Sequence, residues 1–346
     1  MPAVSVILPI YNIKENALRK CLDSIRIQTF SDFEAIMVDD GSEDYVGKVC
    51  SFYARQDARF LYVRQDNGGV CVARNKGLSL SVGEYICFID PDDWIERDYL
   101  KQLVQIIKDT DSDIAVCDCT VYYGERTVQN RFLNTEKAIL KDEDKNLLLY
   151  QLVGKKICAY YPPEIAAGVP WAKIYRKSFL IQNDLTFIPG MKRMEDNIFN
   201  LYAFETARQI AYATDFLYCY RKEAGSASYR FDPELISHFE KYYEETEKFL
   251  NAYQKEQILY DALSMKELTS FNSYLNYYYY CLKEKSTHEV NRMIDEQLKK
   301  EPYASALSKV SSKLLTKQEY IFVTALKYRM YGLLRLLIKA RSVIKK

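Results

Sequence analysis

Long hydrophobic runs and an excess of charge of either sign are both absent from this chain of 346 residues. No stretch approaches the roughly 20 apolar residues that span a bilayer, so a transmembrane segment is not predicted. Met1 leads directly into the strand-like run Ala3–Leu8, which leaves no room for a signal peptide. The formal net charge of +1 argues against nucleic acid as a partner. Together these absences predict a cytoplasmic protein.

Several familiar binding motifs are also missing. The nine cysteines form no CxxC pair, and there are only two histidines, so reduced buried thiols are a simpler interpretation than a zinc site. Neither a GxGxxG fingerprint nor a Walker A loop follows the first expected strand. Tyrosine, in contrast, is abundant at 30 residues, which suits either a wet groove or a packed helical domain.

The first half of the chain alternates short β-branched runs with helical patterns. The expected strands are Val4–Leu8, Ala35–Val38, Phe60–Val63, Tyr85–Ile89 and Asp113–Cys117. The expected helices are Asn16–Gln28, Val46–Ala54, Val70–Leu80 and Tyr99–Lys108. This alternation predicts an α/β, Rossmann-like fold whose central sheet is mostly parallel and flanked by helices.

From Pro233 onward the pattern becomes helical, with Glu234–Ala252 and Gln257–Lys283 as long candidates. We therefore expect a catalytic domain over residues 1–225 and a helical C-terminal region over residues 226–346.

A cluster of carboxylates, Asp90-Pro91-Asp92-Asp93, directly follows the strand that ends near Ile89. Such carboxylates repel one another unless a cation or hydrogen-bond donors neutralise them. Oxygen ligands suit Mg²⁺ or Mn²⁺, which then bridge the phosphate oxygens of a substrate. Capping of a following helix by one aspartate, most simply Asp93, is the structural alternative.

Two further polar segments follow neighbouring strands, where the ligands of parallel sheets bind. Asp39-Asp40-Gly41-Ser42 is also a turn signal, but an aspartate there can accept a hydrogen bond from a nucleobase imide. Asn67-Gly68-Gly69 permits close backbone approach, and Arg74 in the next helix can face a diphosphate. Later in the chain, Glu195-Asp196 opens a helix, where acidic residues either favour the helix dipole or supply a general base.

These segments in this order resemble family 2 glycosyltransferases with the GT-A fold, over about residues 1–230. The matching pieces are Val4–Asn12, Val38–Ser42, Asn67–Gly69, Ala73–Asn75, Gly83–Ile86, Asp90–Asp93 and Glu195-Asp196. The resemblance implies an inverting transfer from a UDP-sugar to a hydroxyl of a glycan or lipid-linked acceptor, in bacterial surface-polysaccharide synthesis.

The resemblance also implies a role for individual residues. Its donor site comprises Pro9 and Tyr11 at the nucleobase, Asp40 (or Asp39) at the uracil N3–H, Arg74 near the base and the diphosphate, and Gly69. Asp90 is implied at the ribose, and Asp92 at Mn²⁺ or Mg²⁺ with Asp90 beside it. Asp196 is implied as the catalytic base, with Trp171, Lys173 and Glu195 on the acceptor side. The run Tyr218–Ser228, which includes Tyr220-Arg221 and Ser226, is similar to a segment that closes beside the phosphates.

The C-terminal tail is basic and amphipathic. After Glu319 it has seven positive charges and no acidic residue. An apolar stripe is expected along one helix, formed by Leu326, Met330, Leu333, Leu337, Ala340 and Ile344. This pattern predicts contact with the cytoplasmic face of a membrane, and a packed helix with a solvated basic side is the alternative.

Two other functions are compatible with a nucleotide-sugar site. A sugar nucleotidyltransferase is expected to carry a glycine-rich basic loop after its first strand, and this chain has none there. A non-catalytic partner subunit of another transferase is expected to lack some of the motif carboxylates, and all of them are present. Self-association into a homo-oligomer is left open.

Overall fold

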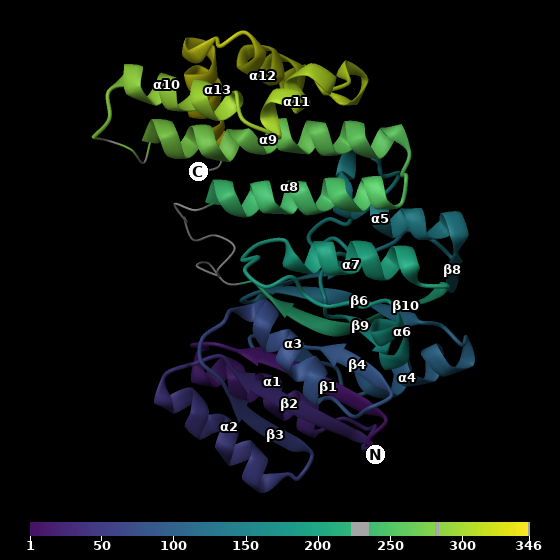
Figure 1. The fold of residues 1–346 in the computed structure, drawn as a ribbon. Coiled ribbons are helices and arrows are strands. Elements are labelled where there is room, and N and C mark those ends of the chain that lie inside the picture. The colour runs from purple at the N-terminus through teal and green to yellow at the C-terminus, as the bar shows by residue number, and fades with distance from the viewer. Residues whose placement is uncertain (223–234, 281, 283, 345–346) are drawn as a thin grey trace. The chain divides into compact units, whose positions relative to one another are not determined.

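The computed structural model describes residues 1–222, 235–280, 282 and 284–344 and divides into two compact units. The first unit comprises Met1–Leu152 and Ala159–Asp232, and the second comprises Val153–Cys158 and Pro233–Lys346. The first unit is α/β and the second is helical, as Figure 1 shows.

The strands of the first unit form one sheet of ten strands in the order β3-β2-β1-β4-β9-β6-β10-β5, with β7 paired to β6 and β8 to β10. They are β1 (Val4–Ile10), β2 (Phe33–Asp39), β3 (Phe60–Arg64), β4 (Tyr85–Phe88), β5 (Trp94–Ile95), β6 (Ile114–Tyr123), β7 (Arg126–Asn130), β8 (Ile139–Lys141), β9 (Lys173–Arg176) and β10 (Gln209–Arg221). The apolar run in β1 is buried along its whole length, as expected for a central strand covered on both faces.

Helices of the first unit pack against this sheet. They are α1 (Glu15–Arg26), α2 (Asp44–Gln56), α3 (Val70–Leu80), α4 (Tyr99–Asp109), α5 (Asn146–Val153), α6 (Lys177–Gln182) and α7 (Glu195–Thr206), with the 3₁₀ turn η1 (Asp142–Lys145). α3 packs on β1 and β2, α2 on β3, and α4 on β6 and β10. The expected α/β fold with a helix-flanked sheet is confirmed.

The sheet contains both parallel and antiparallel strand pairs. β1 runs parallel to β2 and β4, and β2 runs parallel to β3. β9 then runs antiparallel to both of its neighbours, β4 and β6, and the short β5 is antiparallel to β10. β6 and β10 are again parallel to each other. The expected parallel pairing therefore holds among β1 to β4 and between β6 and β10, and it fails where β9, β5, β7 and β8 pair antiparallel with their neighbours.

The second unit is a helical assembly around the long helix α9. Its helices are α8 (Leu235–Ala252), α9 (Gln257–Tyr280), α10 (Thr287–Leu298), α11 (Tyr303–Lys309), α12 (Lys317–Lys327) and α13 (Tyr331–Ile344), with the 3₁₀ turns η2 (Lys155–Ile157) and η4 (Ser312–Leu314). α9 is the longest of these helices, and each of the others contacts it.

The abundant tyrosines form part of the core of this unit. Tyr242, Tyr243, Tyr274 and Tyr303 are buried, and their hydroxyl groups are hydrogen-bonded. For example, the Tyr303 hydroxyl donates to that of Tyr274 at 3.0 Å. Buried tyrosine needs such partners, so the packed helical domain is the interpretation that the structure supports.

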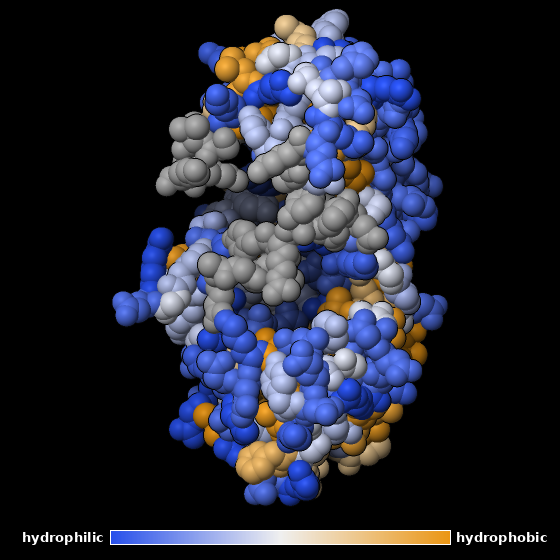
Figure 2. Space-filling view, turned by 90° about the vertical axis from the view of Figure 1, so that its left-hand side faces the viewer, coloured by the Kyte–Doolittle hydropathy of each residue, from blue (hydrophilic) through white to orange (hydrophobic). Residues whose placement is uncertain are grey.

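The expectation that the C-terminal stripe lies along one helix is wrong, because two helices share its residues. α12 ends at Lys327, and Arg329 has a positive φ of 55° before α13 begins at Tyr331. Leu326 is buried in the unit, whereas Met330 in the break is exposed. In the view of Figure 2 the surface is mostly hydrophilic, and hydrophobic residues are scattered over it, some at the top and others in the lower part. Lys345 and Lys346 lie outside the described residues, as do the side chains from Arg341 to Ile344.

Among the described helices, none combines the length and the apolar character needed to cross a membrane. Eight cysteines of the described residues are free thiols, and seven of them are buried.

Candidate active site

Three loops meet at the carboxyl ends of β1, β2 and β4. The Asn12 backbone N–H donates to the Ser42 hydroxyl at 3.1 Å, and the Asn12 side chain accepts from the Glu43 N–H at 2.9 Å. The loop after β1 is therefore tied directly to the loop after β2. Pro9 is buried within β1, while Tyr11 just beyond the strand is 55% exposed, leaving its ring accessible to a planar ligand.

Asp39, at the end of β2, is buried and organises its own turn. One of its carboxylate oxygens accepts from the Ser42 N–H at 2.8 Å. The other accepts from the Tyr62 hydroxyl at 2.8 Å and lies 3.6 Å from an Arg64 nitrogen.

Asp40 is also buried, and its carboxylate holds the glycine loop before α3. It accepts from the backbone N–H groups of Gly68 and Gly69, each at 2.8 Å, and from the Gln65 amide at 2.8 Å. Gly69 is the N-cap of α3 and has a positive φ of 88°, a conformation that glycine adopts without strain. The fold therefore brings two of the predicted site residues together, because the Asp40 carboxylate anchors the loop that contains Gly69.

Arg74 joins two acidic segments that lie far apart in the sequence. Its guanidinium pairs with Asp90 at 3.0 Å and with Glu195 at 3.1 Å, and it lies over the Phe187 ring at 5.0 Å. Burial lowers the pKa of Arg74, but Asp90 and Glu195 outweigh that effect and raise the pKa above its usual value. Its buried Nε has no hydrogen-bond partner among the described residues. Arg74 is therefore a permanent positive charge between the loop after β4 and the start of α7.

The three aspartates after β4 differ in their surroundings. The Asp90 side chain is 26% exposed, whereas Asp93 is fully buried. Asp93 accepts from the Tyr218 hydroxyl and from the Arg221 N–H, both at 2.7 Å. The backbone carbonyl of Asp92 accepts from Arg221 Nε at 2.8 Å.

The interpretation of Asp93 as a helix cap is wrong. The chain forms β5 directly after it, and α4 begins only at Tyr99 with Asp98 as its N-cap. Burial, together with Asp92 and Asp90, raises the pKa of Asp93 well above its usual range. Asp93 is instead the residue that attaches the end of β10 to this loop.

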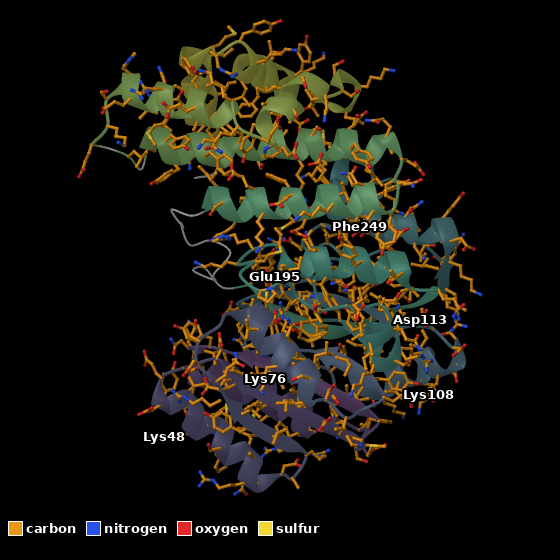
Figure 3. The ribbon with its side chains drawn as sticks, viewed as in Figure 1. Lys48, Lys76, Lys108, Asp113, Glu195 and Phe249 are labelled. Carbon is orange, nitrogen blue, oxygen red and sulfur yellow. The ribbon has the colours of Figure 1, made fainter. Side chains whose placement is uncertain are left out.

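Glu195 and Asp196 form the first turn of α7, and Figure 3 labels Glu195 at this end of the helix. The Asp196 carboxylate accepts from the Asn197 N–H at 2.8 Å, so it satisfies one free donor of the helix start. Burial and the Glu195 charge raise the pKa of Asp196 to about 7, although Arg74 opposes this shift. A carboxyl group with a pKa near neutrality is suited to proton transfer.

Trp171 and Lys173 are buried beside this turn. Trp171 stacks on Tyr218 with a centroid separation of 4.3 Å and also on Tyr220 at 5.3 Å. Lys173 Nζ donates to the carbonyl oxygens of Val169 at 2.7 Å and Trp171 at 3.3 Å, and burial lowers the pKa of Lys173 to about 7. Direct contact with an acceptor stays a prediction for both, and their burial favours a positioning role.

Sequence reasoning missed several contributors to this arrangement. Tyr218 and Arg221 hold the loop after β4, but we had grouped them only with a closing segment whose later part, including Ser226, lies outside the described residues. Phe187 under Arg74 and Asn200 in α7 carried no motif. Nothing in the local sequence marks these two residues as part of the site, because long-range packing brings their segments there.

No three acidic, histidine or cysteine side chains converge on a common metal position in the described residues. Asp90 and Asp92 are two carboxylates on one loop, and Mg²⁺ typically binds through one or two carboxylates together with substrate phosphates. The residues present therefore fit a metal held jointly by protein and ligand.

Comparison with known proteins is consistent with this geometry. A family model described as glycosyl transferase family 2 matches residues 5–180. EpsH of Bacillus subtilis, a provisionally assigned glycosyltransferase, is 33% identical over 258 residues, covering 73% of this chain and 71% of EpsH. The glycosyltransferase GlyA of Streptococcus pneumoniae is 36% identical over 228 residues, covering 65% of this chain but only 31% of GlyA.

Among solved structures, residues 1–349 of TarS from Staphylococcus aureus, in complex with UDP-GlcNAc, resemble the whole chain. The TM-score is 0.67 at 23% identity, covering 99% of this chain and 92% of the TarS chain. At this level of identity the likeness concerns the fold.

Proposed function

The chain belongs to glycosyl transferase family 2 and is a glycosyltransferase, and we propose that it moves a sugar from a UDP-sugar to an acceptor hydroxyl with inversion. The observation that carries this proposal is the Arg74 bridge, which brings Asp90 of the donor loop and Glu195 of the base-bearing turn to one guanidinium. Donor and acceptor groups can therefore meet at a single place.

In this proposal the nucleobase lies against the exposed Tyr11 ring and Pro9. Asp40 accepts from the uracil N3–H, with Asp39 as the alternative. The contacts of the two aspartates support a shared role, because each carboxylate is already fixed by protein donors and keeps acceptor capacity. TarS, which shares the fold, was solved with UDP-GlcNAc, and this supports UDP as the nucleotide.

We place Mn²⁺ or Mg²⁺ at Asp92, with Asp90 beside it. When bound, the ion would offset the negative charge that develops on the departing diphosphate. Asp90 is also paired with Arg74 of α3, so an anionic and a cationic side chain lie together where we place the diphosphate. Gly69, where a side chain would meet open space, leaves the backbone accessible nearby.

Asp196 acts as the base in a single displacement. As the acceptor oxygen forms its bond to the anomeric carbon, the hydroxyl proton passes to the Asp196 carboxylate. The bond between the anomeric carbon and the diphosphate oxygen breaks at the same time, and UDP leaves with the bonding electrons. Because attack and departure occur on opposite faces, the configuration inverts without a covalent intermediate.

The acceptor is proposed to be a glycan or a lipid-linked glycan on the cytoplasmic side of the membrane. Support comes from α13, where Arg335, Leu336 and Lys339 are exposed beside one another on the helix surface. An exposed apolar residue between basic ones suits an anionic bilayer surface. A poly(ribitol-phosphate) β-glucosyltransferase of Bacillus spizizenii is 28% identical over 221 residues, covering 63% of this chain and 32% of that protein, and its polymer acceptor supports a role in bacterial surface-polysaccharide synthesis.

Calorimetry of UDP binding tests the donor and metal assignments. We expect Mn²⁺-dependent binding that weakens at least ~10-fold in Asp92→Ala, since lost charge-assisted contacts cost on the order of 1.5–3 kcal/mol. EDTA should weaken wild-type binding similarly. Asp109→Ala, an exposed aspartate of α4 outside the site, is the matched control and should bind normally. Equal affinity of the wild-type and Asp92→Ala proteins, with and without EDTA, would contradict the metal assignment.

A further inference from the structure

Asn200 is a fully buried residue one helical turn beyond Asp196, and the proposed reaction does not use it. Its side-chain NH₂ donates to the carbonyl oxygens of Gly168 at 2.8 Å, Val169 at 3.1 Å and Asp196 at 3.1 Å. Its side-chain oxygen accepts from the Tyr175 hydroxyl at 2.9 Å. Both ends of the carboxamide are thus engaged, and one of its partners is the backbone of Asp196 itself.

The segment that Asn200 contacts, residues 168–171, is held from its other side as well. Lys173 Nζ donates to the carbonyl oxygens of Val169 and Trp171. Trp171 stacks on Tyr218 with an interplanar angle of 7°, and the Tyr218 hydroxyl donates to Asp93. The 168–171 segment therefore lies between the start of α7 and the loop that carries Asp90 and Asp92.

The first turn of α7 and this segment approach each other very closely. A Cβ atom placed on Gly168 would lie 1.8 Å from the Asn197 side-chain oxygen, so only glycine fits there. The Gly168 backbone thus packs directly against the Asn197 side chain, and the Asn200 hydrogen bonds link the same segment to the next turn of α7. Removing this buried amide is costly, because the Gly168 carbonyl oxygen loses its side-chain donor and the Tyr175 hydroxyl loses its acceptor at 2.9 Å.

From this geometry we infer that Asn200 is a positioning residue for the transfer reaction: its carboxamide locks the Asp196-bearing turn of α7 against the 168–171 segment. This inference rests on the proposed role of Asp196 as the base. A displacement of about 1 Å at a reacting group can cost ~10²-fold in rate. Within the part of the chain that the structure describes, the hydrogen bonds of the Asn200 side chain do not involve the loops that carry Asp40 or Asp92, so donor affinity is not its target.

The test compares Asn200→Ala with Gln28→Ala in the full chain. Gln28 is a matched control because it is also a buried amide of the first unit with three backbone partners: Ser24, Glu96 and Leu100. It contacts neither α7 nor the 168–171 segment through these bonds. Thermal unfolding, UDP affinity, and kcat and KM for transfer are measured for both variants, together with the pH dependence of kcat.

We expect both variants to lose stability, but only Asn200→Ala to lose ~10- to 10²-fold in kcat while its UDP affinity stays within about 2-fold of wild type. In the pH profile of its kcat, the acidic limb, where kcat falls as Asp196 becomes protonated, should also move to lower pH. The reason is that loosening this turn admits water to Asp196, and solvation of the carboxylate lowers its pKa. A kcat loss equal to that of Gln28→Ala, a loss expressed in UDP affinity, or an unmoved acidic limb would overturn the inference. Asp196→Asn in the same assays separates the test of the base from the test of the positioning residue. If Asp196→Asn is fully active, the proposed base is wrong, whatever the result for Asn200→Ala.

Discussion

At the scale of single residues, the site depends on how a few charges compensate one another. Arg74 is buried between Asp90 and Glu195, so removing it would leave two carboxylates without their cation. Asp196 adds a third acidic group within the electrostatic range of Arg74. Uncompensated charges in a buried site cost several kcal/mol, roughly 3–5 for a broken buried pair. We therefore regard Arg74 as the residue on which both halves of the site depend.

The pKa of Asp196 gives a prediction for the pH dependence of transfer. A base must be ionised to accept a proton, and the pKa of Asp196 is raised to about 7, chiefly by burial. We expect kcat to be level above about pH 7 and to fall roughly tenfold for each pH unit well below it. Steady-state rates from pH 5 to 9 at saturating donor and acceptor would show this limb. A rate that stays constant down to pH 5 would contradict the assignment.

At the scale of helices and strands, the sequence was sufficient for the parts that are contiguous. β1 to β4 and the helices between them were predicted because each apolar run is followed by its own helix and its own polar loop. The loops at Asp39, Asp40 and Asp90 then met because parallel strands end at one edge. The sequence could not show that Asp40 anchors the Gly68 and Gly69 N–H groups, since that contact depends on loop geometry.

The elements that were missed are those whose partners lie far away in the chain. β9 inserts between β4 and β6, and β10 pairs with β6 through register irregularities between Ala213 and Tyr218. No local period reveals either pairing. For the same reason the sequence could not place Tyr218 against Asp93, and helix capping by Asp93 therefore stood as an alternative until the structure excluded it. The break between α12 and α13 was missed because Arg329 is not a usual helix terminator.

At the scale of the whole molecule, the two units differ in chemistry. The motif carboxylates all lie in the first unit, whereas the second carries the basic tail and a tyrosine-rich core. The first unit is sufficient to hold the proposed donor and base residues. The second unit is the part for which we propose contact with a membrane surface.

Sedimentation with anionic vesicles tests that membrane contact. We expect wild-type protein to sediment with phosphatidylserine-containing vesicles and to be released by salt, because each basic residue near such a surface contributes about 1 kcal/mol. Leu336→Glu, at an apolar position of α13 that is 64% exposed, should reduce sedimentation. Ile181→Glu is the control, since Ile181 is 63% exposed on α6 of the other unit. Equal sedimentation of wild-type protein and both variants would favour a helix that is merely packed and solvated.

A loss of activity in Asp196→Asn is informative only if the variant is folded. The raised pKa of Asp196 predicts how its stability should compare with that of the wild type, which thermal unfolding measures. The folded-state pKa of about 7 lies above the usual value of 3.8, so the folded protein holds this proton more tightly than the unfolded chain. The associated stabilisation is complete below about pH 4 and is lost as the pH rises through 7. A neutral asparagine avoids that loss, so Asp196→Asn should be at least as stable as the wild type at pH 8.

The central claim is that this chain is an active transferase whose base is Asp196. Its most direct test is transfer by wild-type and Asp196→Asn proteins, using the UDP-sugar identified by a screen for UDP release. We predict that Asp196→Asn binds UDP with near wild-type affinity and transfers sugar at least ~10²-fold more slowly, the usual scale for general-base catalysis. Transfer by Asp196→Asn at the wild-type rate would contradict the account.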